Sequence, residues 1–233
     1  LRGAFDVALE IRREGDPGHA AMISRGIARV QRSMHITAGT RAAPLIPSSA
    51  MGKGRRTRDD FDGSQVIETA TMVLFWQPPA VFGQWTDSVF TVDGVTYRCA
   101  EQFMMAEKAR LFGDEATRAK ILASDSPREH KALGRAVAGF DEATWTAACL
   151  DIVVRGNLAK FDQNPAMRAA LLATGDRLLV EASPLDRVWG VGLRADDPRI
   201  HDRATWRGQN LLGEALMRVR AELRARGDHG AAT

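Results

Sequence analysis

Hydrophobic and polar positions along this chain follow a pattern typical of regular structure only from about residue 71 onward. Two β-prone segments, residues 88–92 and 95–97, flank Asp93-Gly94. Both residues of this pair tolerate positive φ angles, so the sequence favours a two-residue hairpin turn between the segments. Further strands are expected at residues 71–76 and 177–182. The pattern therefore predicts a small β-sheet with a hairpin.

Six helices are predicted from apolar spacing and from residues that favour helix ends. The expected helices span residues 100–112, 114–122, 142–161, 164–175 and 210–226, with another beginning at Ser126. Asp114 is a good N-cap residue, and Pro127 suits the first helical position, where its missing N–H costs nothing. In the last helix, Leu212, Leu216 and Val219 fall on one apolar stripe. The sequence therefore predicts an α+β fold that is mainly helical.

Residues 1–70 differ in composition from the rest of the chain. They are rich in Gly, Ala, Ser and Arg and contain none of the five tryptophans. Few large apolar side chains are present to offset the entropy of ordering, so we expect a low-complexity, disordered basic extension with a short helix near residues 5–13. The folded domain is expected at residues 71–227, and residues 228–233 are expected to form a tail.

Three interpretations of this extension are open. It can be a flexible arm that contacts anionic partners or a targeting peptide. It can also be upstream sequence translated from a misplaced start, since the chain begins with Leu1, and Met51 or Met72 would serve as a start. Acidic residues interrupt the basic run, which disfavours a targeting peptide.

The net charge of +3 comes entirely from the N-terminal part of the chain. Residues 1–70 contain 11 Lys and Arg against 8 Asp and Glu, whereas residues 71–233 contain 21 of each kind. A nucleic-acid-binding domain usually carries a broad cationic surface. The balanced charge of residues 71–233 therefore disfavours such a domain.

Cysteine and histidine usage gives no sign of a metal or a cofactor. Cys99 and Cys149 are neither spaced as a metal knuckle nor numerous enough for a disulfide framework, which favours a reducing, cytoplasmic location. The five histidines are scattered. No apolar run approaches the roughly 20 residues that a membrane-spanning helix requires. Cys99 is expected to be a small buried residue rather than a nucleophile.

The densest candidate chemistry lies in the helix predicted at residues 100–112, which carries Glu101 and Lys108. Seven residues bring the second side chain to within about 20° of the first and about 10.5 Å further along the axis. Both side chains therefore project from one face, too far apart for a direct ion pair, and a ligand can be held between them. The alternative is an ordinary acid in the first helical turn and a solvated lysine.

A second candidate is the loop at residues 183–192, which contains Asp186, Trp189, Gly190 and Gly192. Loops on a rigid scaffold often carry binding groups, and glycines allow a ligand to approach the backbone closely. Trp189 has the right shape to stack on a heterocyclic base. The alternative is a tight turn in which Trp189 fills the core and Asp186 caps the turn.

Two more segments combine aromatic, amide and glycine character. One segment contains Phe82, Gln84 and Trp85, whose rings can stack on a ligand while the amide hydrogen-bonds to it. The alternative is that these residues are part of the core. Asn210 is a natural N-cap at the start of the last helix, where free N–H groups suit an anion such as phosphate. A plain helix cap is the alternative for Asn210.

Taken together and in this order, these segments resemble the YbiA-like family, also called NADAR. The resemblance rests on Phe82-Gly-Gln-Trp85, Phe90-Thr-Val-Asp-Gly94, Tyr97-Arg-Cys-Ala-Glu101-Gln-Phe-Met-Met-Ala-Glu-Lys108-Ala, Ser126-Pro-Arg-Glu-His-Lys-Ala-Leu-Gly134-Arg135, Lys160-Phe161-Asp-Gln-Asn164, Leu172-Ala-Thr-Gly-Asp176, Leu179-Val-Glu-Ala-Ser-Pro-Leu-Asp186-Arg-Val-Trp189-Gly190 and Asn210-Leu-Leu-Gly213. It covers residues 73–224. One departure is Ala100-Glu101-Gln102, where many members have Ser-Glu-His.

The resemblance implies an N-glycosidase that cleaves a nitrogen base from a phosphoribosyl or ADP-ribosyl group. It implies phosphoribosylamino-pyrimidine intermediates of riboflavin synthesis as substrates and, for some members, ADP-ribosylated guanine. The implied catalytic residues are Glu101, Lys108 and Asp186, and the implied substrate-binding residues are Phe82, Gln84, Trp85, Tyr97, Trp189, Gly190 and Asn210. Nucleic acid is implied only as an ADP-ribosylated substrate, and no cofactor is implied.

The bond to be cleaved suggests how these residues would act. Breaking a C1′–N bond develops positive charge at C1′, which a carboxylate stabilises while it activates water. Glu101 or Asp186 can do this, and the leaving base needs a proton from the other acid or from Lys108. Lys108 can also trap an opened ribose as a Schiff base or bind a phosphate. A non-catalytic module that binds ADP-ribose or NAD is the alternative class.

Overall fold

The computed structural model describes residues 66–230 of the 233-residue chain. The chain divides into two units, Leu1–Gly52 and Lys53–Thr233, and all of the described residues belong to the second unit. The helix predicted near residues 5–13 and nearly all of the predicted extension lie outside the described residues. Within them, no helix is both long and apolar enough to span a membrane.

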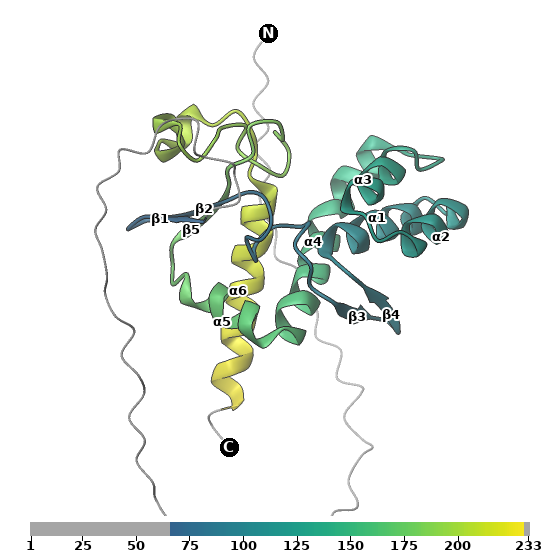
Figure 1. Ribbon diagram of the computed structural model, residues 1–233, viewed down its shortest axis with the longest axis horizontal. Coiled ribbons are helices and arrows are strands. Elements are labelled where there is room, and N and C mark those ends of the chain that lie inside the picture. Colours follow the sequence, from purple (N-terminus) through teal and green to yellow (C-terminus); the bar gives the residue numbers. More distant parts are fainter. Residues whose placement is uncertain (1–65, 231–233) are drawn as a thin grey trace, which may run out of the picture. The chain divides into compact units, whose positions relative to one another are not determined.

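The described residues form five strands and six α-helices, which confirms the predicted α+β class with its helical majority (Figure 1). The strands are β1 (Ile67–Glu68), β2 (Met72–Phe75), β3 (Phe90–Val92), β4 (Val95–Tyr97) and β5 (Leu178–Glu181). The helices are α1 (Ala100–Leu111), α2 (Glu115–Ala123), α3 (Pro127–Arg135), α4 (Glu142–Gln163), α5 (Pro165–Ala173) and α6 (Leu211–Gly230). Two short 3-10 helices, Pro198–His201 and Arg203–Thr205, lie between β5 and α6.

Three of the strands form a sheet in the order β1-β2-β5, in which β1 is antiparallel and β5 is parallel to β2. The register pairs Met72 with Leu178 and Phe75 with Glu181. A parallel pair needs a long crossover connection, and here the crossover contains the β3–β4 hairpin and all of α1 to α5. Strand β1 was not predicted, because a strand of two residues carries no periodicity.

The predicted hairpin is present as β3 and β4, which pair antiparallel in the register Val92 to Val95. Asp93 has a φ angle of 51° and Gly94 a φ angle of 78°. Two successive positive φ angles match the twist that a two-residue hairpin requires, and few residues other than Asp, Asn and Gly adopt them at low cost. The turn prediction is therefore confirmed for the reason on which it was based.

Local capping residues define where the helices begin. The Asp114 side chain accepts a hydrogen bond from the Thr117 N–H at 3.0 Å, and the Ser126 side chain accepts one from the Glu129 N–H at 3.4 Å. Each bond satisfies one of the N–H groups that a helix leaves unpaired at its start. At the other end, α6 continues past the predicted stop at residue 227 to Gly230.

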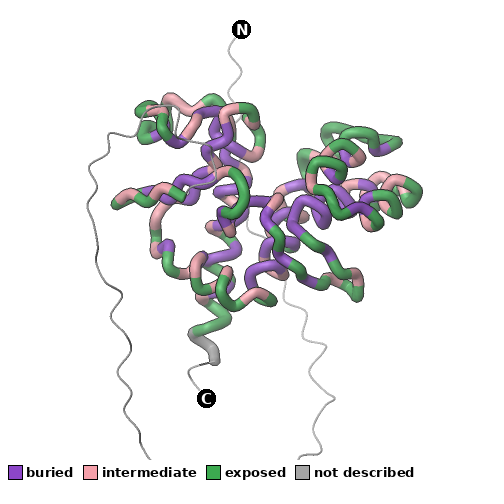
Figure 2. Tube along the Cα trace, in the orientation of Figure 1, coloured by how far each residue is buried: buried purple, intermediate pink, exposed green. Residues whose placement is uncertain are grey.

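The sheet separates two groups of buried apolar residues. Figure 2 shows where buried residues lie along the chain. Val73, Phe75 and Leu179 point into the larger group, which the helices fill. Because side chains alternate along a strand, their neighbours Met72, Leu74 and Val180 point to the opposite face. The segment between β5 and α6 covers that second face, with Val191, Leu193 and Ile200 as its buried members.

Helix α1 is buried on nearly all sides. Every residue from 100 to 107 is buried, including the polar Glu101, Gln102 and Glu107. The first two turns of α1 are therefore buried rather than exposed to solvent. Gln102 shows how such a helix is tolerated, since its side-chain amide donates to the Ile121 carbonyl at 3.1 Å and to the Ser124 carbonyl at 3.1 Å. Buried polar groups are stable when they find such partners.

Candidate functional site

Polar side chains gather where the parallel strands β2 and β5 end. Glu181 is the last residue of β5 and pairs in register with Phe75, the last residue of β2. The loop after β2 carries Trp85, and the loop after β5 carries Asp186. The carboxyl ends of parallel strands are a common place for ligand binding, because the loops that follow them diverge there. The sheet therefore brings together residues far apart in the sequence.

Helix α1 begins beside these loops and carries Glu101 in its first turn. The Glu101 N–H donates to the Gln84 carbonyl at 2.9 Å, which ties the helix start to the loop after β2. The side chain is only 3% exposed, and its Oε1 is buried without a hydrogen-bond partner. Trp85 hydrogen-bonds through its side chain to the same carboxyl group. An open acceptor in a buried carboxyl group is costly, and such groups frequently mark functional sites.

The charges around Glu101 come from helix α3 and from the loop after β5. Burial raises the pKa of Glu101 to about 7, and the nearby Asp186 raises it further. Lys131 and Arg135 of α3 act in the opposite direction, as does the hydrogen bond from Trp85. A carboxyl group with a pKa near neutrality can both take up and release a proton under physiological conditions, which suits it to acid–base catalysis.

Both carboxylate oxygens of Asp186 have partners that hold the side chain in place. Its Oδ1 accepts hydrogen bonds from the Val188 N–H at 3.0 Å and the Trp189 N–H at 2.9 Å. Its Oδ2 lies 3.5 Å from the Lys131 Nζ. The predicted turn-capping role is therefore observed. The same side chain also pairs with Lys131 of α3 and raises the pKa of Glu101.

Two further members of this cluster, Glu181 and Lys131, were not among the predicted site residues. Glu181 is partly buried, its Oε2 is buried without a partner, and its pKa is raised to about 8 by burial and by Asp186 and Glu101. Lys131 opposes this shift. An acid within a strand that is otherwise apolar was the one signal for Glu181 in the sequence, whereas nothing distinguished Lys131 from a solvated helical lysine.

The residues after Asp186 close tightly around the end of β5. Trp189 is partly buried and packs against the larger apolar group. Gly190 is buried, and a Cβ atom there would lie 2.9 Å from the Glu181 carbonyl oxygen and 3.1 Å from the Asp186 carbonyl oxygen. Any side chain would push these segments apart. Gly190 is thus required for packing of the site loop against the strand.

Lys108 projects from the same helix as Glu101 but has its own partners. Its Nζ donates to the Gly134 carbonyl at 2.9 Å. The ammonium group also lies 4.2 Å from the centre of the Phe140 ring and 5.3 Å from that of Trp145. Such cation–π contacts stabilise a partly desolvated charge. Burial lowers the pKa of Lys108, which increases the fraction of neutral, nucleophilic amine.

Two side chains of α4 hold the loop after β2 in place through hydrogen bonds. Buried Lys160 donates to the Gly83 carbonyl at 2.9 Å, and Asn157 donates to the Gln84 side-chain oxygen at 3.0 Å. Phe82 is buried in the core beside Phe75, with ring centres 5.5 Å apart. Of the three predicted residues in this loop, only Trp85 interacts through its side chain with the carboxyl cluster. Phe82 and Gln84 lie behind it and fix the loop.

The side chain of Asn210 forms its hydrogen bonds with strand β5. Its side chain donates to the Leu179 carbonyl at 2.9 Å and accepts from the Glu181 N–H at 3.0 Å. The N–H groups at the start of α6 are also paired, Leu211 with the Val188 carbonyl and Leu212 with the Trp189 carbonyl. The N–H groups of the first two residues of α6 are therefore already occupied. Asn210 instead extends the hydrogen bonding of β5 beyond the sheet.

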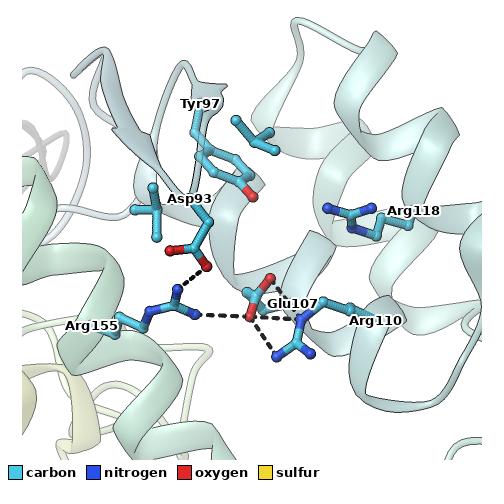
Figure 3. A pocket seen from close by; sticks show the side chains of 8 residues that line it. Asp93, Tyr97, Glu107, Arg110, Arg118 and Arg155 are labelled. Atoms are coloured by element: carbon cyan, nitrogen blue, oxygen red, sulfur yellow. Dashed lines mark hydrogen bonds and ion pairs between the residues drawn. The ribbon is translucent and has the colours of Figure 1, made fainter.

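Tyr97 lies in a different part of the domain from Glu101. It lines a cavity of about 330 Å³ together with Asp93, Glu107, Arg110, Arg118 and Arg155 (Figure 3). Glu107 is paired with Arg110 at 2.9 Å and with Arg155 at 3.4 Å, and Arg155 also pairs with Asp93. These arginines are already neutralised by carboxylates. The cavity is therefore held together by an ion-pair network on another face of α1.

Neither a thiol nucleophile nor a metal site accompanies the carboxyl cluster. Cys99 is buried, and burial raises the pKa of its thiol to about 11, so that it stays protonated. Residues 66–230 contain no group of three or more His, Cys, Asp or Glu side chains arranged to hold a metal ion.

The structure defines an α+β protein with a carboxyl-rich site at the ends of two parallel strands, and sequence relatives identify its family. The NADAR domain family matches residues 74–224. This chain therefore belongs to the NADAR domain family.

Two curated relatives carry an activity in their names. N-glycosidase R617 of Acanthamoeba polyphaga mimivirus is 42% identical over 147 residues, covering 61% of this chain and 86% of that protein. N-glycosidase YbiA of Escherichia coli is 29% identical over 162 residues, covering 68% of this chain and 92% of that protein. N-glycosidases are hydrolases that act on N-glycosyl bonds.

Two further comparisons extend the likeness. Protein irg-1 of Caenorhabditis elegans is 37% identical over 171 residues, covering 66% of this chain and 81% of that protein. Among solved structures, the NMR structure of Escherichia coli YbiA matches with a TM-score of 0.57 and 27% identity, covering 69% of this chain and 89% of that chain. The resemblance expected from the sequence is therefore confirmed at the level of family and fold.

Proposed function

We propose that this protein is an N-glycosidase that hydrolyses the bond between a ribosyl group and a nitrogen base. The observation that carries the proposal is Glu101, a buried carboxyl group with an open oxygen and a pKa of about 7, placed beside Asp186 and Trp85. The names of its relatives support the same activity. The proposed substrates have a phosphoribosyl or an ADP-ribosyl group on the base.

Cleavage of the C1′–N bond leaves positive charge on C1′ and returns the electron pair to the nitrogen. Ionised Glu101 would stabilise this charge and accept a proton from the attacking water, and a pKa of about 7 keeps it largely ionised above neutral pH. Asp186, held against Lys131, adds negative charge near the sugar. Trp85 and Trp189 offer aromatic surface for the base. The departing base must still receive a proton.

Paired substrate assays test this proposal. The purified protein is incubated with a phosphoribosylamino-pyrimidine, as formed in riboflavin synthesis, and separately with DNA that carries ADP-ribosylated guanine. Release of free base is then followed by chromatography. We expect turnover of the pyrimidine substrate. Turnover of the DNA alone would redirect the proposal to reversal of ADP-ribosylation, and binding of both without turnover would overturn it in favour of a ligand-binding module.

Lys108 provides a separate prediction about the reaction. We expect Lys108→Met to lower base release at least about tenfold, because it removes the only amine held over Phe140 and Trp145 among the described residues while preserving an apolar chain of similar length. Steady-state kinetics measure this effect. Unchanged base release from a folded Lys108→Met protein would exclude Lys108 from the reaction.

The Lys108→Arg variant separates the two roles open to this residue. Arginine keeps the charge that would bind a phosphate but cannot form a Schiff base with an opened ribose. Reduction of the reacting wild-type protein with borohydride would fix such an adduct on Lys108, visible as added ribosyl mass. Activity retained by Lys108→Arg supports phosphate binding, whereas activity lost together with the adduct supports the Schiff base.

A further inference from the structure

Glu181 is a second acid of the candidate site with a buried carboxylate oxygen, and its backbone is held by hydrogen bonds on both sides. Its N–H donates to the Asn210 side chain at 3.0 Å, and its carbonyl accepts from the Val191 N–H at 3.0 Å. It also pairs with Phe75 across the parallel strands. A side chain that leaves such a strand end has a direction set by the sheet rather than by a mobile loop.

Two carboxyl groups of the site share one unusual property. Glu101 Oε1 and Glu181 Oε2 are both buried and both lack a hydrogen-bond partner. They are the only carboxylate oxygens in this condition among the described residues. The two groups interact electrostatically, since Glu101 raises the pKa of Glu181.

The surrounding charges cannot support full ionisation of the cluster. Asp186 and Glu101 face Glu181 as acids, and Lys131 of α3 is the cation that opposes them. Lys131 already lies 3.5 Å from the Asp186 Oδ2. Glu101 has two further stabilising neighbours, Arg135 and the Trp85 side chain, which Glu181 lacks. When two nearby carboxyl groups compete for one proton, the proton stays on the less stabilised one.

We propose that Glu181 is the general acid of the site, which delivers a proton to the leaving base while ionised Glu101 activates the water. This inference rests on the proposed N-glycosidase function. In the step, the water oxygen bonds to C1′ as the C1′–N bond breaks, and the electron pair of that bond remains on the nitrogen. The nitrogen takes the Glu181 proton and Glu101 takes one proton from the water. Return of that proton to Glu181 restores the starting state, so that ribosyl–base and water give ribose and free base.

Glu181→Gln tests the proposal, because glutamine keeps the shape of a protonated glutamate but donates no proton to the base. We expect base release from a ribosylated base to fall by about 10²- to 10⁴-fold, the usual contribution of general acid catalysis. Hydrolysis of p-nitrophenyl ribofuranoside should fall by less than about tenfold, since nitrophenolate leaves without a proton. Glu101→Gln should instead impair both reactions. Equal losses of Glu181→Gln on both substrates would overturn the role.

Glu107→Gln is the matched control, because Glu107 is also a buried glutamate of the domain but lies in the ion-pair network around Tyr97. We expect it to change neither the ratio of the two activities nor the pH profile. In Glu181→Gln, the basic limb of the profile should disappear, because that limb reports loss of the Glu181 proton, whereas the acidic limb should stay in place, because Glu181 is uncharged while Glu101 titrates. A basic limb that persists unchanged in Glu181→Gln would contradict the role of Glu181 as the acid.

A readout independent of turnover separates this inference from the proposed function. Carbon NMR of protein labelled at the glutamate carboxyl groups follows each titration directly, with Glu181→Gln used to assign the signal. We expect the Glu181 carboxyl group to lose its proton after Glu101, well above the range of exposed glutamates. If Glu181 lost its proton in the same pH range as exposed glutamates, the inference would be overturned even in an active enzyme. If Glu181 lost its proton late but no base were released, only the proposed function would be overturned.

Discussion

Replacement of Glu101 by glutamine is expected to lower base release by at least about 10²-fold while the protein becomes more stable above pH 7. The loss follows because glutamine cannot take a proton from water or carry the charge that stabilises C1′. The gain follows because the ionised carboxyl group is buried with one oxygen unpaired. Rate measurements and thermal unfolding on the same preparation test both parts. Full activity of Glu101→Gln would contradict the proposed mechanism.

The pH dependence of this stabilisation has a definite sign. The pKa of Glu101 rises from 4.5 to about 7 in the folded protein, so the folded state binds the proton more tightly than the unfolded state. Stability is therefore lost as pH rises from about 4.5 to 7, and the loss is complete above 7. At pH 8, glutamine should recover on the order of 3 kcal/mol, whereas at pH 4 the two proteins should differ little. A larger difference at pH 4 than at pH 8 would contradict this account.

The second large effect is expected for stability, at Asn210. Asn210→Ala removes both bonds to β5 and leaves the Leu179 carbonyl and the Glu181 N–H without partners. Each orphaned group costs about 1–3 kcal/mol, and alanine at a φ angle of 59° adds roughly 1 kcal/mol of strain. We therefore expect the free energy of unfolding to fall by about 3–7 kcal/mol, measured by urea denaturation.

Two variants separate this structural role of Asn210 from substrate binding. Asn210→Gly tolerates the positive φ angle but loses both bonds, so it should be destabilised slightly less than Asn210→Ala. Asn210→Asp keeps an acceptor for the Glu181 N–H but buries a carboxylate against the Leu179 carbonyl, so at neutral pH it should be at least as destabilised as Asn210→Ala. Unchanged stability of all three variants with a raised KM would contradict the structural role and favour direct contact with substrate.

Features that depend on neighbouring residues in the sequence were predicted well. The Asp93-Gly94 turn and the helix starts at Asp114 and Ser126 are each decided by one or two side chains and the backbone beside them. Helix geometry also placed Glu101 and Lys108 on one helix. The depth at which α1 is buried could not be predicted, because its polar residues find their partners on α2 and α4, which a helical projection does not contain.

Which residues make up the site is decided by contacts between segments that are far apart in the sequence. Glu181 and Lys131 join Glu101 only because β5 pairs with β2 and α3 lies against α1. Asn210 has the residue type of an N-cap, but its side chain reaches back to β5 instead. Tyr97 belongs to a matching family motif and still lines a different cavity. Order along the chain identified the family, whereas the assignment of side chains to one site required the tertiary structure.

The parallel pairing of β2 with β5 also has a consequence during synthesis of the protein. Contacts between segments far apart in sequence form late, because a long chain must close before they are made. Glu101 leaves the ribosome well before Glu181, Asp186 and the strand that holds them. A nascent or truncated chain that ends before β5 therefore has its buried glutamate without the acid and the loop that complete the site, so hydrolytic activity should first appear only after the whole domain has emerged.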